Sequence, residues 1–124
     1  MAEPALDPGA ITGYHAHLYY DALTRKSAAK LRERIAALFP AARLGNWHDG
    51  PVGPHPVGMY QIAFAVADFP RLVPWLMLNR RDHLVLVHPL TGDDYADHAH
   101  HALWLGDKLP LDLEVLRKVE NGLR

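Results

Sequence analysis

The first clear pattern along the chain is an alternation of apolar and polar residues over residues 13–21, which predicts a β-strand. Successive side chains of a strand point to opposite faces, so His15 and His17 share one face. At about 3.3 Å of rise per residue, their Cα atoms lie about 7 Å apart. Two imidazoles at this spacing can converge on one metal ion, or one can bind while the other moves protons.

Periodicity predicts the other elements in turn. Strands are expected at residues 43–48, 59–66, 84–89 and 102–105, with helices from residue 24 or 27 to about 39, at 69–79 and from about 113 onward. Residues 49–58, which hold three prolines and three glycines, form a loop, and residues 91–101 form a polar loop with three acids and three histidines. Residues 1–12 form a flexible lead-in, and residues 13–124 form a single domain.

This order of elements predicts an α+β fold, a ferredoxin-like β-α-β-β-α-β sandwich with an antiparallel-rich sheet and an extra C-terminal helix. The two main helices should cover one face of the sheet. We expect the first and third strands to be neighbours and parallel, and the fourth to be antiparallel to the first. His15, His55 and His88 then meet at one end of the sheet, with His17 one pleat further along.

The same pattern predicts the core. Ten apolar residues of the strands and helices should be mostly buried. They are Ala16, Leu18, Leu31, Ile35, Leu38, Ile62, Phe64, Leu76, Val85 and Val87.

Composition narrows the functional classes. A net charge of −1 gives no sign of the basic surface that binds nucleic acid, and the absence of cysteine excludes disulfides and thiolate sites. The apolar runs are too short to cross a membrane and the N-terminus lacks signal-peptide features, so we expect a cytoplasmic protein. A homodimer is expected, because helices on one side leave the other face of the sheet to be covered. Residues 111–123 are the alternative cover for that face within one chain.

Nine histidines are the unusual feature of the composition. Converging neutral imidazoles suit a divalent transition metal that keeps open positions. Fe(II) would fit oxygen chemistry, whereas Zn(II) with three histidines and water would fit hydrolysis or hydration. Asp94 and Asp97 could add a carboxylate ligand or orient an imidazole.

Four short motifs make the chain resemble the DOPA 4,5-dioxygenase-like family. They are HAHLYY at residues 15–20, GPHPVG at 53–58, VHPLTG at 87–92, and Asp97-His98 followed by LWLG at 103–106. They occur in family order over most of the chain. The resemblance implies a ferredoxin-like fold, a non-haem Fe(II) centre and extradiol cleavage of a small catechol, DOPA or a related phenolic, by O₂.

The resemblance also implies roles for single residues. His17, His55 and His88 are the first choice of metal ligands, with His15 close behind. Whichever of His15 and His17 does not bind the metal acts as acid or base, and His98 is another acid–base candidate.

Further residues enter around this site. Tyr19, Tyr60 and Trp104 are candidates for stacking on the substrate ring, with a role in the core as the alternative. Arg80 and Arg81 are candidates for a substrate carboxylate, against the alternative of a solvated turn. His48 and His83 lie outside the motifs and are expected to matter little.

Two other functions fit the same residues. One is a hydrolase or lyase that uses zinc or another metal on the same histidines. The other is a non-enzymatic dimeric module that binds a metal or a small ligand.

Overall fold

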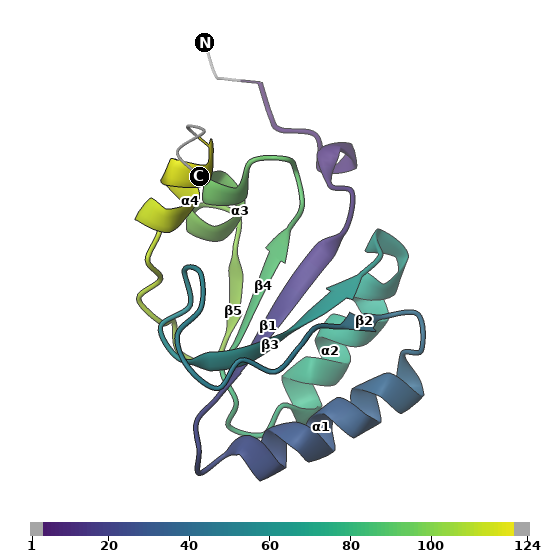
Figure 1. Ribbon diagram of the computed structural model, residues 1–124. Coiled ribbons are helices and arrows are strands. Elements are labelled where there is room, and N and C mark those ends of the chain that lie inside the picture. The colour runs from purple at the N-terminus through teal and green to yellow at the C-terminus, as the bar shows by residue number, and fades with distance from the viewer. Residues whose placement is uncertain (1–3, 121–124) are drawn as a thin grey trace.

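The computed structural model describes residues 4–120 and contains a five-stranded sheet in the order β2-β3-β1-β4-β5 (Figure 1). Every pair of neighbouring strands is antiparallel. This order is the ferredoxin-like arrangement with β5 added beside β4, so the predicted fold class is confirmed. The strands are β1 (Tyr14–Tyr20), β2 (Arg43–Leu44), β3 (Gly58–Phe64), β4 (Val85–Pro89) and β5 (Leu103–Leu105).

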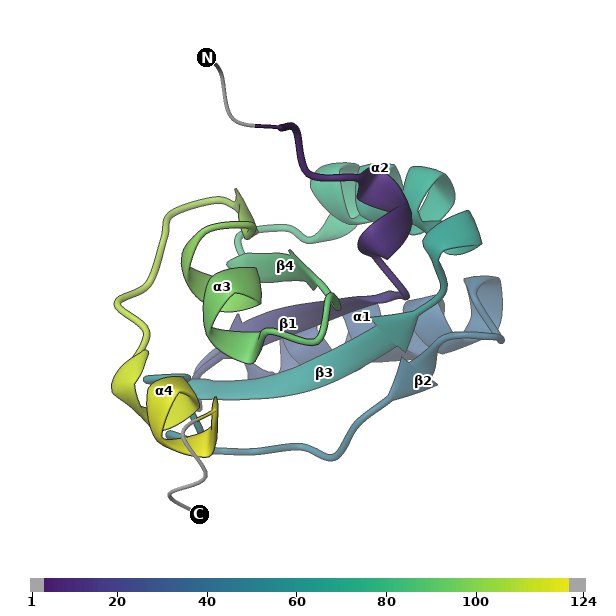
Figure 2. The same ribbon diagram turned by 90° about the horizontal axis from the view of Figure 1, so that it is seen from above.

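Four α-helices and two short 3₁₀ helices complete the described chain. Helices α1 and α2 lie on one face of the sheet, and α3 and α4 lie on the other (Figures 1 and 2). The helices are η1 (Pro8–Ala10), α1 (Arg25–Leu38), η2 (Val66–Asp68), α2 (Phe69–Asn79), α3 (Asp94–Ala99) and α4 (Glu114–Glu120).

The expected parallel pairing of the first and third strands is wrong. Strand β3 runs antiparallel to β1, with Tyr14 opposite Phe64 and Tyr20 opposite Gly58. In the ferredoxin-like order the right-handed crossover from β1 through α1 leads to β2, which is parallel to β1, and β3 fills the gap between them. The beginning of β3 therefore lies beside the end of β1, so strand direction alone does not bring His55 to His15.

The helix-covered face of the sheet holds the larger hydrophobic cluster. Ala16, Leu18 and Tyr20 of β1 pack there against buried residues of α1 and α2. Nine of the ten residues expected in the core are buried, and Leu38 is the exception at 49% exposure. Leu38 is the last residue of α1, one turn beyond Ile35, which is the last buried residue of the helix.

The opposite face carries a smaller cluster built on Tyr19, Met59 and Leu86. Leu109 and Leu111 pack against it, and the Asp112 N–H donates to a backbone carbonyl of the loop before β3. The chain that follows β5 thus covers much of this face within one protomer, which is the alternative to a dimer that the sequence left open.

Two local predictions need correction. Residues 91–101 are not simply a loop, because they contain α3, whose N-cap Asp93 accepts a hydrogen bond from the Ala96 N–H. Strand β2 is also shorter than predicted and ends before Gly45, although the Gly45 N–H still donates to the Gln61 carbonyl and His48 forms an isolated bridge with Met59.

The lead-in before β1 contains η1, capped by the Asp7 carboxylate, which accepts from the Gly9 N–H. Thr12 then bonds the Leu90 carbonyl through its N–H and its hydroxyl. Residues 1–3 of this segment and residues 121–124 of the domain lie outside the described part. No helix in residues 4–120 is long and apolar enough to cross a membrane.

Candidate metal centre

Five histidine rings from four separate segments meet on the face of the sheet opposite α1 and α2. His15 and His17 come from β1, His88 from β4 and His98 from α3, while His55 comes from the loop before β3. His15 lies directly opposite His88 in the antiparallel ladder. Ring centroids are 3.9 Å apart for His88 and His98, 4.2 Å for His17 and His55, and 5.1 Å for His17 and His88. The predicted convergence is therefore present, with His98 as its fifth member.

A tight turn brings His55 back over the sheet. Val52 and His55 exchange backbone hydrogen bonds of 3.2 and 2.9 Å, and Gly53 between them has a φ of 54°, which glycine adopts readily. The Pro54 carbonyl accepts the Asp112 N–H, so the C-terminal segment fixes the turn from outside. This turn, and not the direction of β3, brings His55 to the cluster.

Three of the rings have Nδ1 engaged on the side away from the cluster. His88 Nδ1 lies 2.9 Å from the Pro89 carbonyl and His98 Nδ1 lies 2.7 Å from the Asp94 carbonyl, so each Nδ1–H donates. In a neutral imidazole with Nδ1 protonated, Nε2 carries a free lone pair. His55 Nδ1 lies 2.7 Å from the Tyr19 hydroxyl and can take the same tautomer by donating to the phenol oxygen. Such outer partners orient metal-binding histidines.

His17 is the central ring, and it is 3% exposed. Its Nε2 lies 3.1 Å from His88 Nε2, which can only accept, so the His17 Nε2–H donates. His17 Nδ1 is then a buried acceptor, and it has no hydrogen-bond partner among the described residues. A buried polar atom without a partner is costly, and metal binding would satisfy it. The residues present therefore fit a divalent metal.

Two trios of histidines have ligand nitrogens within 4.8 Å of one another. One is His15, His17 and His88, and the other is His17, His55 and His98. The trio expected from the family motifs, His17, His55 and His88, is neither of these, but each observed trio contains two of its members. His17 belongs to both.

Burial keeps four of these rings, those of His15, His17, His55 and His88, neutral near pH 7. Desolvation, aided by the neighbouring histidines, lowers the pKa of His17 well below its usual value, that of His55 to about 4 and that of His88 to about 3. Desolvation and His98 also lower the pKa of half-buried His15, where Asp94 opposes and Arg43 reinforces the change. Neutral imidazoles are the form that binds metals, so these four rings need no proton loss before binding.

Other predicted residues are divided between the two faces. Tyr19 and Trp104 lie beside the cluster with stacked rings, centroids 6.0 Å apart. Tyr60 lies away from the cluster, because it is fully buried on the helix-covered face of the sheet and donates its hydroxyl hydrogen to the Ala28 carbonyl. Asp97 is also fully buried, and its carboxylate accepts from the N–H and hydroxyl of Thr91, so it holds the start of the α3 segment.

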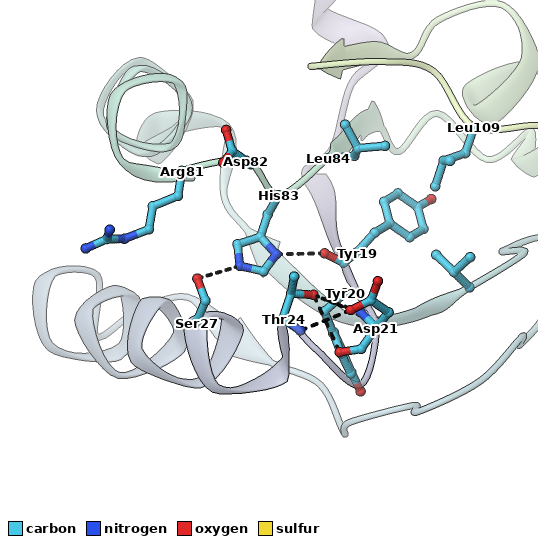
Figure 3. Close-up of a pocket in the computed structure, with 11 residues that line it drawn as sticks. Tyr19, Tyr20, Asp21, Thr24, Ser27, Arg81, Asp82, His83, Leu84 and Leu109 are labelled. Atoms are coloured by element: carbon cyan, nitrogen blue, oxygen red, sulfur yellow. Dashed lines mark hydrogen bonds between the residues drawn. The ribbon is translucent and has the colours of Figure 1, made fainter.

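The turn that carries Arg80 and Arg81 lies away from the histidine rings. Arg80 donates to the His83 carbonyl, and Arg81 lines a separate pocket of about 380 Å³ (Figure 3). Figure 3 also shows His83 between β1 and α1, where its ring bonds the Tyr19 carbonyl and the Ser27 hydroxyl. This ring is 5% exposed and ties two elements together, so we expect it to contribute to stability. That it matters little to the site stays a prediction.

The Tyr19 hydroxyl on His55 was not predicted, and Asp94, a predicted candidate for orienting an imidazole, contacts His98 through its backbone carbonyl. The position of Tyr19, two residues after His17 on the same strand face, was the available signal for the first. The second depends on α3, because His98 lies four residues after Asp94 within that helix.

Comparison with known proteins assigns the chain to a protein family. The model of the Dopa 4,5-dioxygenase family matches residues 14–115, which hold all five histidines of the cluster. The chain belongs to this family. Membership of the Dopa 4,5-dioxygenase family supports an oxygenase, and the predicted family resemblance is confirmed.

Individual relatives agree with this assignment. A crystal structure of a candidate dioxygenase from Nostoc punctiforme has 51% sequence identity and a TM-score of 0.91, and covers 93% of this chain and 99% of its own. A DOPA 4,5-dioxygenase of Amanita muscaria is 34% identical over 83% of this chain and 49% of its own length. An uncharacterised 21.2 kDa protein of Botryotinia fuckeliana is 35% identical over 97% of this chain and 71% of its own. The chain thus spans about half the length of the fungal DOPA dioxygenase.

Proposed function

We propose that this protein is a non-haem Fe(II) dioxygenase that cleaves the ring of a small catechol, DOPA or a related phenolic, in the extradiol manner. The observation that carries the proposal is the cluster of five histidines, four of them buried, around a His17 Nδ1 that has no hydrogen-bond partner among the described residues. Membership of the Dopa 4,5-dioxygenase family supplies the reaction class. The sequence has no cysteine, and within residues 4–120 the candidate ligand groups contain only histidine, so imidazole is the proposed ligand type.

His17, His55 and His88 are the proposed ligands. His17 is shared by both trios, and the rings of His55 and His88 each have Nδ1 held by an outer partner. Nε2 would then be their ligand atom, and His88 Nε2 would exchange the His17 Nε2–H that it accepts for the metal. Ferrous iron bound there would supply open coordination positions at which a catechol and O₂ are held together. In the overall reaction a ring C–C bond breaks, both atoms of O₂ enter the product, and no outside reductant is consumed.

His15 and His98 are the proposed proton carriers. His15 is the only half-buried ring of the five, so it can exchange protons with solvent and with an incoming substrate. Its lowered pKa leaves it neutral and able to accept the catechol proton at neutral pH. His98 has a fixed Nδ1–H and directs its other side to His88, where it can return a proton during ring opening.

The test is anaerobic reconstitution with Fe(II), followed by exposure to catechols and O₂. A yellow ring-fission chromophore, with one O₂ consumed per catechol, is the expected result. A matched sample loaded with Zn(II) should give no chromophore, because zinc does not support oxygen chemistry of this kind. If the Fe(II) protein consumes no O₂ with any catechol while the Zn(II) protein hydrolyses or hydrates a substrate, the zinc-dependent alternative replaces this proposal.

A further inference from the structure

A straight row of four residues crosses the sheet at the end where β1 begins. The strand register places Arg43 of β2 opposite Ala63 of β3, Ala63 opposite His15 of β1, and His15 opposite His88 of β4. Directly opposed residues in a ladder point to the same face. Leu44, the next residue of β2, packs in the cluster on the helix face, which places the Arg43 side chain on the histidine face.

Arg43 and His15 also line one pocket of about 310 Å³. About 10 Å separates Cα atoms two strands apart, and Ala63, the only side chain directly between them in the row, is a single methyl group. The long Arg43 side chain can therefore extend over Ala63 toward His15. The Arg43 charge is among those that lower the pKa of His15, after burial and His98, which agrees with this proximity.

The charge of this pocket is one-sided. Its lining residues include Arg43 but no aspartate or glutamate. Arg43 is exposed, and in the described part of the chain no carboxylate forms an ion pair with it. Arg25, the first residue of α1, is by contrast paired with Asp49 at 2.9 Å. The Arg43 guanidinium, which lies on the same face of the sheet as the cluster, is available to an anion.

We infer that Arg43 is a specificity-determining residue that binds the carboxylate of a catechol whose ring lies toward His15 and the histidine cluster. This inference rests on the proposed function and deepens it by naming the substrate class. A planar guanidinium binds a carboxylate through two parallel hydrogen bonds, which fixes the direction of the molecule as well as its position. The preferred substrates are catechols with a carboxylate on a short side chain.

The same pocket gives no counter-charge to an ammonium group. Asp94 is the acid that acts electrostatically on His15, but it lies on α3 and is not part of the pocket lining. An amino group beside the substrate carboxylate would therefore meet Arg43 without a partner of its own. A deaminated catechol acid should bind better than the corresponding amino acid, and a catechol amine without a carboxylate should bind worst.

The first experiment compares three catechols on the Fe(II)-reconstituted protein. These are 3-(3,4-dihydroxyphenyl)propionate, DOPA and 4-ethylcatechol, which carry a carboxylate, a carboxylate with an ammonium, and no charge. Arg43→Gln should raise KM for the propionate about 10- to 100-fold, the effect of losing a charged hydrogen-bond pair, and leave kcat and the KM for 4-ethylcatechol unchanged. Arg43→Lys should restore part of the loss. Arg34→Gln, an equal loss of charge on the exposed side of α1, should change neither KM.

The second experiment does not need turnover. Binding of 3-phenylpropionate, which has the carboxylate but no hydroxyls, is measured by calorimetry on the metal-free protein. Weaker binding by at least 10-fold in Arg43→Gln, with no change in Arg34→Gln, supports the Arg43 subsite even if no catechol is cleaved and the proposed function fails. Equal affinity of wild type and Arg43→Gln, or no binding by the wild type, overturns the inference. So does an equal rise of KM for charged and uncharged catechols in Arg43→Gln.

Discussion

Replacement of Tyr19 by phenylalanine tests whether the hydroxyl of this residue orients a metal ligand. The hydroxyl lies 2.7 Å from His55 Nδ1, and both side chains are buried, at 4% exposure each. Burial raises the pKa of the Tyr19 phenol, so the group stays uncharged at neutral pH. Tyr19→Phe removes one oxygen atom and leaves the ring stacked on Trp104.

The expected loss follows from this one contact. A buried ring nitrogen left without a partner costs about 1–3 kcal/mol of the free energy of unfolding. Without the phenol oxygen, nothing at that position favours the His55 tautomer that carries its proton on Nδ1 and its lone pair on Nε2. Loss of such an outer partner lowers metal affinity by about 10- to 100-fold. That factor corresponds to about 1.4–2.7 kcal/mol of binding free energy.

The assay has two readouts and a matched control. Metal affinity is measured by competition with a chromophoric chelator, and the unfolding free energy of the metal-free protein is measured by urea denaturation. Tyr60→Phe is the control, because it also removes a buried hydroxyl, one that donates to the Ala28 carbonyl on the other face of the sheet. Tyr60→Phe should lower the unfolding free energy by about 1 kcal/mol and leave metal affinity unchanged.

Metal affinity should therefore fall in Tyr19→Phe but not in Tyr60→Phe. If Tyr19→Phe and Tyr60→Phe destabilise the metal-free protein alike and neither changes metal affinity, Tyr19 is only a core residue. The assignment of His55 as an oriented ligand would then be refuted.

Four further outcomes are expected. His88→Ala should fold yet lose most bound metal, whereas His98→Ala should keep the metal and lose turnover by about 10²–10⁴-fold. Metal analysis measures the first effect and O₂ uptake the second. Full metal content and full activity in His88→Ala would exclude His88 as a ligand. His83→Ala should lower the free energy of unfolding by about 2–4 kcal/mol without changing metal content, because the ring fills buried space and makes two hydrogen bonds. The metal-free protein should lose stability as the pH falls from about 6.5 toward 4, since His55 and His88 titrate near 4 and 3 when folded and near 6.5 when unfolded. Each of these two histidines lowers the free energy of unfolding by up to about 1.4 kcal/mol for each pH unit of acidification. A urea midpoint that does not change over this range would show that His55 and His88 are not buried as neutral rings. The homodimer stays a prediction, although the chain after β5 covers much of the sheet face that motivated it, and light scattering that shows only a 13.9 kDa species at low concentration would count against it.

The alternation of residues along the strands was enough to predict the faces of the sheet. Ala16, Leu18 and their neighbours are buried against the helices because a strand allows each side chain only one of two faces. For the same reason His15 and His17 had to share a face, and the register places His88 across from His15. These features depend on local geometry, which the order of residues fixes.

The remaining features depend on contacts between distant segments. The strand direction deduced for His55 was wrong, and the residue still reaches His17 because a tight turn at Gly53, held by the Asp112 N–H, folds the loop back over the sheet. The hydrophobic periodicity of the sequence cannot predict such a turn, because the turn gains its stability from partners elsewhere in the chain.

The outer partners of the cluster were likewise decided by the tertiary structure. Whether an imidazole offers a lone pair or a proton depends on which atom touches its other nitrogen, and for His55 that atom is the hydroxyl of Tyr19, 36 residues away. Arg43 also had no distinguishing pattern, and only the register across β2, β3 and β1 places it in line with His15. The sequence by itself determined which residue types could form the site, and the packing of loops and helices on the sheet decided which atoms face one another.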